Sequence, residues 1–337
     1  MRWMIAACLG LFAFQPAHAF KYIPTSQAQC TSMNFQQVFP MKMRNQNNLG
    51  WCYAHAAADL LQYTYKLPIQ VSAADIAINY SKSKWSRFVT FFTRIFSREL
   101  RKEPPQTGMI KNAVQMILPQ GYCPESSLPS DEWTKVDPNT LASSKEEILQ
   151  SVLDSYDLQN QVHRGVFRSA DQLPWYFEFK NIDRDRFFLI LKNSSKKTFL
   201  ETLRKAACGG DRVPFPNHRI GIDFRFRTRH IFQEINAGFD RGTPPTIDFF
   251  SDVFYHYDSA KKDISTLHTV LLYGRRFDSE ANECVYMIKN SYGANCDHVD
   301  SDTGLPYDPK LECEAGNIWL PESKMFPAIT SRLILHR

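Results

Sequence analysis

The stretch Trp51–Lys66 reads WCYAHAAADLLQYTYK, and its periodicity decides how the first half of the chain folds. Its apolar residues recur at helical spacing, in a run that is rich in alanine and leucine and contains neither glycine nor proline. The pattern therefore predicts a helix that begins at Cys52. A cysteine at a helix start is chemically notable, because the positive end of the peptide dipoles favours the thiolate.

Outward from this helix, the two halves of the chain differ in their patterns. Further helices are expected at Ala73–Tyr80, Ile110–Ile117 and Ser144–Ser155. Short β-prone runs bounded by Gly, Asn, Asp or Pro follow at Thr246–Phe250, Thr269–Tyr273, Cys284–Lys289 and Ile318–Leu320. A helical lobe followed by a strand-rich lobe predicts an α+β fold, with the active site in a cleft between the lobes.

Composition and charge indicate a folded protein without a nucleic-acid partner. The chain has 337 residues, 43% of them apolar, so it can bury a substantial core. Its 40 basic residues are interspersed with 35 acidic ones, and the net charge of +5 gives no indication of nucleic-acid binding. The excess of basic over acidic residues is concentrated in Asn160–Asp240, where 15 basic and nine acidic residues give a net charge of +6 (15 minus 9). An anionic partner there is one interpretation, and a solvated strand face at Ile222–Arg227 is the other.

The N-terminus has the pattern of a secretory signal peptide. A positive charge within Met1–Trp3 precedes the apolar stretch Met4–Phe14, and Ala17-His18-Ala19 supplies a small-residue cleavage site. We therefore expect residues 1–19 to be removed and the protein to be periplasmic or extracellular. The apolar stretch is shorter than the roughly 20 residues that span a bilayer, so no transmembrane segment is expected.

The number of cysteines in the expected mature chain is odd. Without Cys8, the seven that remain are Cys30, Cys52, Cys123, Cys208, Cys284, Cys296 and Cys313. An odd number in an exported protein indicates one free thiol beside up to three disulfides. Since six cysteines allow 15 pairings, the connectivity stays open. We expect Cys52 to be unpaired, and the bridges to include the three cysteines of the strand-rich lobe.

The segment Pro40–Ala54, PMKMRNQNNLGWCYA, resembles the active-site segment of the papain family. There a glutamine lies six residues before a cysteine that is followed by an aromatic residue and alanine. The resemblance implies that Cys52 is a nucleophile. It also implies that the Gln46 side chain and the backbone N–H of Cys52 form an oxyanion hole.

Two later segments resemble the same family in the same order. Leu267–Gly274, LHTVLLYG, is similar to the strand that opens with the catalytic histidine, and Tyr286–Gly293, YMIKNSYG, is similar to the asparagine motif. The resemblance implies that His268 is the base and that Asn290 orients its ring, as the third group of a triad does. Three matches in the right order are far more specific than any one of them.

The sequence also departs from the papain pattern. Leu49 stands where a disulfide cysteine is usual, Tyr292 replaces a tryptophan, and His55 occupies a position that is usually phenylalanine. Cys52 and His268 are 216 residues apart (268 minus 52), beyond the roughly 130 to 150 of papain and cathepsins. An insertion over residues 131–234 accounts for the excess. Only Phe20–Asn45 separates the signal from Gln46, so we expect no N-terminal inhibitory propeptide.

Together these patterns predict a papain-like, two-lobed mature domain over residues 20–337. Residues 20–130 form a mainly helical lobe, 131–234 the insertion and 235–337 a mainly β, barrel-like lobe. The expected activity is cysteine peptidase on a protein or peptide substrate, without metal or cofactor. A transglutaminase-like acyltransferase is one alternative, although that class favours aspartate over Asn290. A papain-fold binding protein that has lost catalysis is the other.

Overall fold

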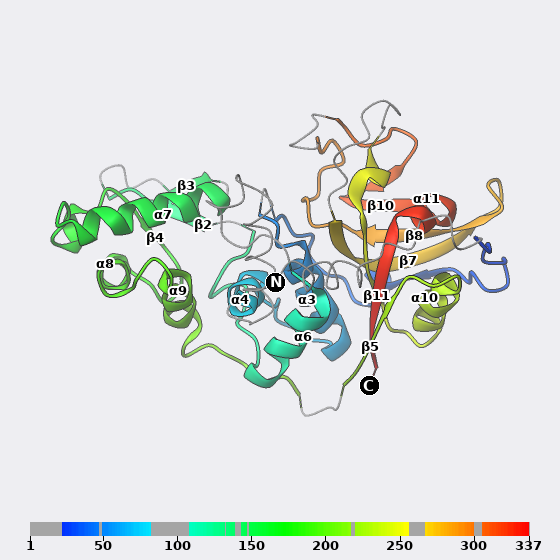
Figure 1. Cartoon of the computed structure of the whole chain (residues 1–337), viewed down its shortest axis with the longest axis horizontal. Coiled ribbons are helices and arrows are strands. Elements are labelled where there is room, and N and C mark those ends of the chain that lie inside the picture. The colour runs from blue at the N-terminus through cyan, green and yellow to red at the C-terminus, as the bar shows by residue number, and fades with distance from the viewer. Residues whose placement is uncertain are drawn as a thin grey trace, which may run out of the picture.

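The computed structural model describes residues 22–46, 49–81, 108–131, 133–138, 143–146, 148–216, 220–255, 267–299 and 305–336. The segment expected to be a signal peptide lies outside these ranges. Figure 1 shows one group of helices in the middle of the molecule, a sheet on one side and a second group of helices on the other. The chain therefore has the α+β architecture that the sequence predicts.

The helical lobe is built around α3 (Cys52–Tyr65), which contacts α4 (Ala73–Tyr80), α6 (Ile110–Ile117) and strand β7 of the sheet. All three predicted helices have the expected bounds, and α3 does begin at Cys52. Every α3 residue after Cys52 is buried, which explains its many small side chains. At Gly108 an added Cβ would lie 2.6 Å from the Tyr53 ring, so only glycine allows this close approach.

The second lobe is an eight-stranded sheet. Its order is β5-β11-β6-β7-β8-β10-β9, and β1 also pairs with β7. The strands are β1 (Met33–Asn34), β5 (Gly221–Phe226), β6 (Thr246–Phe250), β7 (Leu267–Asp278), β8 (Glu283–Lys289), β9 (Glu312–Glu314), β10 (Asn317–Pro321) and β11 (Ile329–His336). All four runs that were predicted as strands lie in this sheet. The helices α2 (Phe35–Val38), α10 (Ile231–Asp240) and α11 (Glu322–Ala328) belong to this half, as does the 3₁₀ turn η5 (Ser251–Phe254).

Strand β5 contains Arg225, the first of the two arginines that alternate in Ile222–Arg227, and it lies within the range predicted as insertion. It pairs with β11 and is therefore part of the large sheet. Its charged face is neutralised internally, because Arg225 and Arg332 form ion pairs with Asp223 and Glu234. These arginines consequently serve the sheet's own charge balance.

Residues 133–208 form a separate group of elements with its own aromatic core. A three-stranded sheet of β2 (Trp133–Val136), β3 (Ser143–Glu146) and β4 (Tyr176–Phe177) accompanies α7 (Ile148–His163), α8 (Arg184–Asn193) and α9 (Phe199–Cys208). The helix predicted from Ser144 is wrong at its start. Residues 143–146 pair with β2 instead, so sheet pairing overrides the local preference for helix.

This group is attached to the helical lobe on the side away from the large sheet (Figure 1). A disulfide joins Cys123 to Cys208, and the buried carboxylate of Asp75 in α4 forms ion pairs with Arg204 and Arg212. Part of the local basic excess is therefore used in docking. The anionic partner inferred from that excess has no support from the fold. No helix in the described part of the chain is long and apolar enough to cross a bilayer.

Candidate active site

Cys52 is the first residue of α3 and the free cysteine of the described chain. The other six form the disulfides Cys30–Cys284, Cys123–Cys208 and Cys296–Cys313, which confirms the expected exclusion of Cys52. Burial raises the pKa of the Cys52 thiol to about 11. The backbone N–H of Thr269 opposes this effect by hydrogen bonding to the sulfur. In the substrate-free site the thiol form is thus favoured.

His268 is the second residue of β7, and its ring is buried. The ring stacks on Tyr292 at a centroid distance of 4.9 Å and meets Phe249 and Phe254 edge-on. Burial lowers the pKa of His268 to about 4, and the hydrogen bond to Asn290 offsets this only partly. The imidazole is therefore neutral near pH 7, which is the state that a general base requires.

Asn290, directly after β8, holds the ring of His268. Its Oδ1 lies 2.9 Å from His268 Nε2 and also accepts the backbone N–H of Ser291, while its Nδ2 donates to the Tyr307 hydroxyl. A backbone N–H can only donate, so the atom that it contacts must be the amide oxygen. His268 Nε2 must then carry the proton. Nδ1 is left with the lone pair that can accept a proton from a thiol.

Thr269 connects the base to the nucleophile. It follows His268 in β7, and its backbone N–H lies beside the sulfur of Cys52, where it lowers the pKa of the thiol. Strand β7 packs against α3 along its length. The first two motifs of the sequence, 216 residues apart, are thereby brought together (268 minus 52).

Gln46 is joined to the asparagine motif. Its backbone N–H donates to the Ser291 carbonyl at 2.7 Å, and its Oε1 accepts the Ser291 hydroxyl. Its Nε2 donates to the Leu49 carbonyl at 3.0 Å, which uses one of its two protons. The side chain is held at both ends in the loop that leads to Cys52.

A buried ion cluster fixes the strand of Asn290 to the helix of Cys52. Lys289 Nζ lies 2.7 Å from Asp59 Oδ2 and donates to the Lys42 carbonyl at 2.9 Å, and Arg44 Nε lies 2.7 Å from Asp59 Oδ1. Burial alone would raise the pKa of Asp59, but the positive charges of Lys289 and Arg44 hold it below its usual value. Because removing one member of such a cluster leaves a buried charge unpaired, the cluster keeps the two lobes in one relative position.

Tyr292 covers His268 in place of the usual tryptophan. Its ring lies between those of His268 and His298, stacked on the second at a centroid distance of 4.4 Å. The aromatic cover that the resemblance implies is therefore retained, with a smaller ring.

His55 is buried on α3, one turn beyond Cys52, and belongs to a different environment from His268. Neither of its ring nitrogens has a hydrogen-bond partner among the described residues. Burial and the neighbouring Arg44 lower the pKa of His55 to about 3. An unpaired, neutral imidazole without an orienting group has none of the features that Asn290 gives to His268.

We expect His55→Phe to keep or raise the stability of the fold, with a larger gain in acid. Phenylalanine removes a buried ring whose polar atoms are unpaired. Below pH 6.5 an unfolded histidine takes up a proton, whereas folded His55 does so only near pH 3, so His55 lowers stability progressively as the pH falls through this window. Denaturant unfolding should show a gain about 2 kcal/mol larger at pH 5 than at pH 7. An equal change at both pH values would contradict this account.

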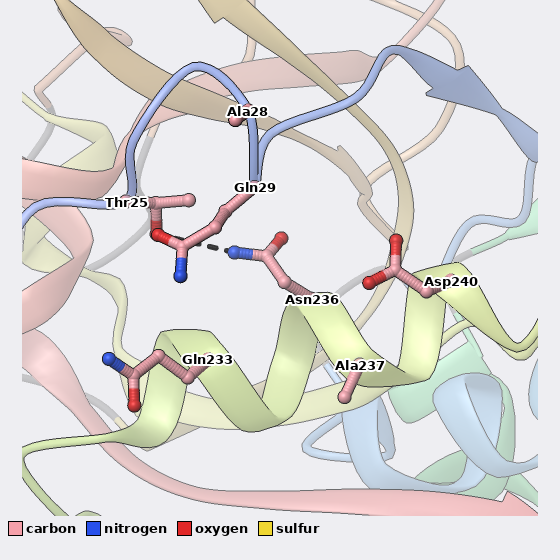
Figure 2. A pocket seen from close by; sticks show the side chains of 7 residues that line it. All are labelled: Thr25, Ala28, Gln29, Gln233, Asn236, Ala237 and Asp240. Carbon is pink, nitrogen blue, oxygen red and sulfur yellow. Dashed lines mark hydrogen bonds between the residues drawn. The ribbon is translucent and has the colours of Figure 1, made fainter.

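A cavity of about 240 Å³ lies elsewhere in the sheet lobe, between the N-terminal segment and α10 (Figure 2). Thr25, Gln29, Gln233, Asn236 and Asp240 contribute to its lining, and Asn236 Nδ2 donates to the Thr25 hydroxyl at 3.2 Å. The Asn236 oxygen accepts from Arg275 and from the Tyr286 hydroxyl. None of the four predicted site residues lines this cavity.

Sequence reasoning missed three residues that support the site. Thr269 directly follows His268, but nothing in the sequence shows that it contacts the sulfur. Tyr307 and Asp59 come from segments outside the three motifs, so no local pattern indicates their partners. Within the described residues, no group of three or more His, Cys, Asp or Glu side chains is arranged to hold a metal ion.

Comparison with known proteins gives structural neighbours only. No profile of a known family and no curated protein matches the sequence. A structure from a study of the mite allergens Blo t 1 and Der p 1 is 11% identical, with coverage of 98% of this chain and 77% of that chain and a TM-score of 0.45. Digestive procathepsin L 3 of Tenebrio molitor is 10% identical, with coverage of 92% and 72% and a TM-score of 0.45. Bromelain from Ananas comosus, solved in complex with E64, is 14% identical, with coverage of 90% and 97% and a TM-score of 0.39.

The structure brings residues of the three motifs close together. In the described chain a free cysteine, Cys52, begins a helix beside strand β7. This strand carries His268, which is hydrogen-bonded to Asn290. The chain also has the α+β two-lobed fold that the resemblance of the three motifs implies.

Proposed function

We propose that this chain is a cysteine peptidase in which Cys52 attacks the peptide carbonyl and His268 carries the proton. The observation that supports this most strongly is the 2.9 Å bond between His268 Nε2 and Asn290 Oδ1, in a strand whose next residue contacts the Cys52 sulfur. It sets the tautomer in which His268 Nδ1 is an acceptor, with the Tyr292 hydroxyl 3.5 Å from this nitrogen.

The proposed reaction has two stages. His268 Nδ1 takes the thiol proton while the sulfur bonds to the carbonyl carbon, and then gives this proton to the amine as the C–N bond breaks. Water next attacks the thioester with His268 again as base, and the acid is released as the thiol reforms. Because burial disfavours both the thiolate and the imidazolium, we expect proton transfer to accompany attack.

Oxyanion stabilisation is assigned to the backbone N–H of Cys52 and the amide of Gln46. We expect Gln46→Ala to lower kcat by about 10²-fold or more, the scale for losing one oxyanion donor. Steady-state kinetics on a fluorogenic peptide would measure this, with KM changing less than kcat. A loss confined to KM would argue against the role. Gln46→Glu retains the size of the side chain but has no N–H to donate to the Leu49 carbonyl or to the oxyanion, so it should be similarly impaired.

We also propose that the protein is exported from the cell's cytoplasm. Three disulfides form in the described chain, and such bridges persist in oxidising compartments such as the periplasm or the extracellular space. Cleavage after Ala19 can be checked by N-terminal sequencing of the protein recovered from a secreting host.

Activity-based labelling tests the assignment against its alternatives. A papain-type epoxide probe should label Cys52 rapidly and selectively, as mass spectrometry of the labelled peptide would show. A binding protein that has lost catalysis would be labelled slowly, at the rate of an ordinary thiol. A transglutaminase-like enzyme would incorporate a primary amine into a glutamine peptide faster than it hydrolyses the peptide.

A further inference from the structure

A carboxylate beside the nucleophile takes no part in the proposed reaction. Asp248 lies in β6 directly opposite Thr269 of β7, and it is close enough to Cys52 for its charge to raise the thiol's pKa. Its side chain is only partly exposed. A negative charge here disfavours the thiolate on which catalysis depends, so the residue works against the nucleophile when the site is empty.

The hydrogen-bond partners of Asp248 are neutral. Its Oδ1 accepts the Thr269 hydroxyl at 2.6 Å, and its Oδ2 accepts the hydroxyl of Ser331 from β11. An ionised carboxylate has about four acceptor positions, so these two hydroxyls leave capacity for further donors. Burial raises the pKa of Asp248, and the two hydroxyls lower it only in part.

No basic side chain in the described part of the chain forms an ion pair with Asp248. The basic residue closest in sequence to Ser331, one of the two partners of Asp248, is Arg332, the next residue of β11. Alternate residues of a strand face opposite sides, and Arg332 is held on the other side by Asp223 and Glu234. His268, on β7, is directed to Asn290. Among the described residues, no basic side chain therefore compensates the charge of Asp248, whose partner across the sheet, Thr269, lies beside Cys52.

We propose that Asp248 is a specificity residue, whose carboxylate binds a cationic side chain of the peptide substrate, lysine or arginine, beside the scissile bond. This inference rests on the proposed peptidase function. A purely structural link between β6, β7 and β11 would be made equally well by a neutral amide or hydroxyl, without the cost of a partly buried charge. Cationic substrate would supply the missing counter-charge, and it would also remove the field that opposes the thiolate.

The test compares peptides that differ only in charge. Lysine is scanned through four positions on each side of the scissile bond of a fluorogenic peptide and compared with norleucine and Nε-acetyl-lysine. At one position we expect lysine to raise kcat/KM by about 10-fold to 10²-fold, the range for a charged hydrogen bond. Asp248→Asn, which preserves shape, should reduce this ratio to near one.

Asp252 provides a matched control. It lies in η5, four positions along the same segment, and burial raises its pKa as well. Asp252→Asn also removes one negative charge from this segment, but it should leave the preference for lysine intact. If Asp252→Asn abolished the preference while Asp248→Asn kept it, or if the wild type cleaved all peptides without any preference for lysine, the assignment would be overturned.

Labelling separates this inference from the proposed activity. Epoxide probes that carry lysine or norleucine report recognition at Cys52 without turnover. A preference of about tenfold for the lysine probe that Asp248→Asn abolishes would support the role of Asp248, even if no peptide were hydrolysed. Equal labelling by both probes would overturn that role even if hydrolysis were observed. Iodoacetamide labelling of Cys52 in the Asp248→Asn variant would show that the site is intact. The pH profile of this labelling should move to lower pH than in the wild type, because the charge that raises the pKa of Cys52 has been removed.

Discussion

Cys52→Ala should abolish peptide hydrolysis while the protein stays folded. The sulfur atom forms the covalent bond to the substrate, so no other group of the site can replace it. The expected fall in kcat is about 10⁴-fold or more, the scale on which loss of a nucleophile acts in enzymes of this logic. Progress curves with a fluorogenic peptide at high enzyme concentration would measure the residual rate.

The fold should tolerate this substitution for reasons visible in the structure. Cys52 is outside the three disulfides, and alanine is the best helix former at the start of an alanine-rich helix. Thermal unfolding should therefore stay close to that of the wild type. Titration of free thiols in the unfolded mature protein should fall from one to none. Unchanged turnover in a folded Cys52→Ala variant would refute the proposed activity.

The sequence predicted the parts of this structure that depend on local pattern. The helix from Cys52, the helices at Ala73 and Ile110, and all four strands followed from periodicity and from bounding turn residues. The pairing of His268 with Asn290 was implied by resemblance, and the structure places these two side chains in contact. Both kinds of prediction rely on information that a short segment contains.

Contacts between distant segments could not be predicted in this way. Ser143–Glu146 looks helical by itself and becomes a strand only because β2 lies beside it. Asp59 pairs with Lys289 across 230 residues, and Asp248 reaches the cysteine only because β6 is next to β7. Burial shifts the pKa of Cys52 and His268 through the whole packed environment, which no single motif encodes.

His268→Ala should lower kcat/KM by at least about 10²-fold, whereas His55→Phe should remain active. Both histidines are buried near Cys52, and both have a pKa well below the usual value for histidine. They differ in what holds them. His268 has Asn290 to fix its proton on Nε2, while His55 has no described partner at either nitrogen and follows Cys52 on the same helix.

This difference determines which ring can perform acid-base catalysis. A base must accept the thiol proton and return it to the departing nitrogen, so it must lie across from the helix that carries Cys52 and keep one tautomer. His268, on the sheet opposite the helix, meets both conditions. The pair should be compared by kcat/KM at pH 7, with circular dichroism to establish that each variant is folded. A folded but inactive His55→Phe beside a His268→Ala of near wild-type activity would show that the base has been assigned to the wrong histidine.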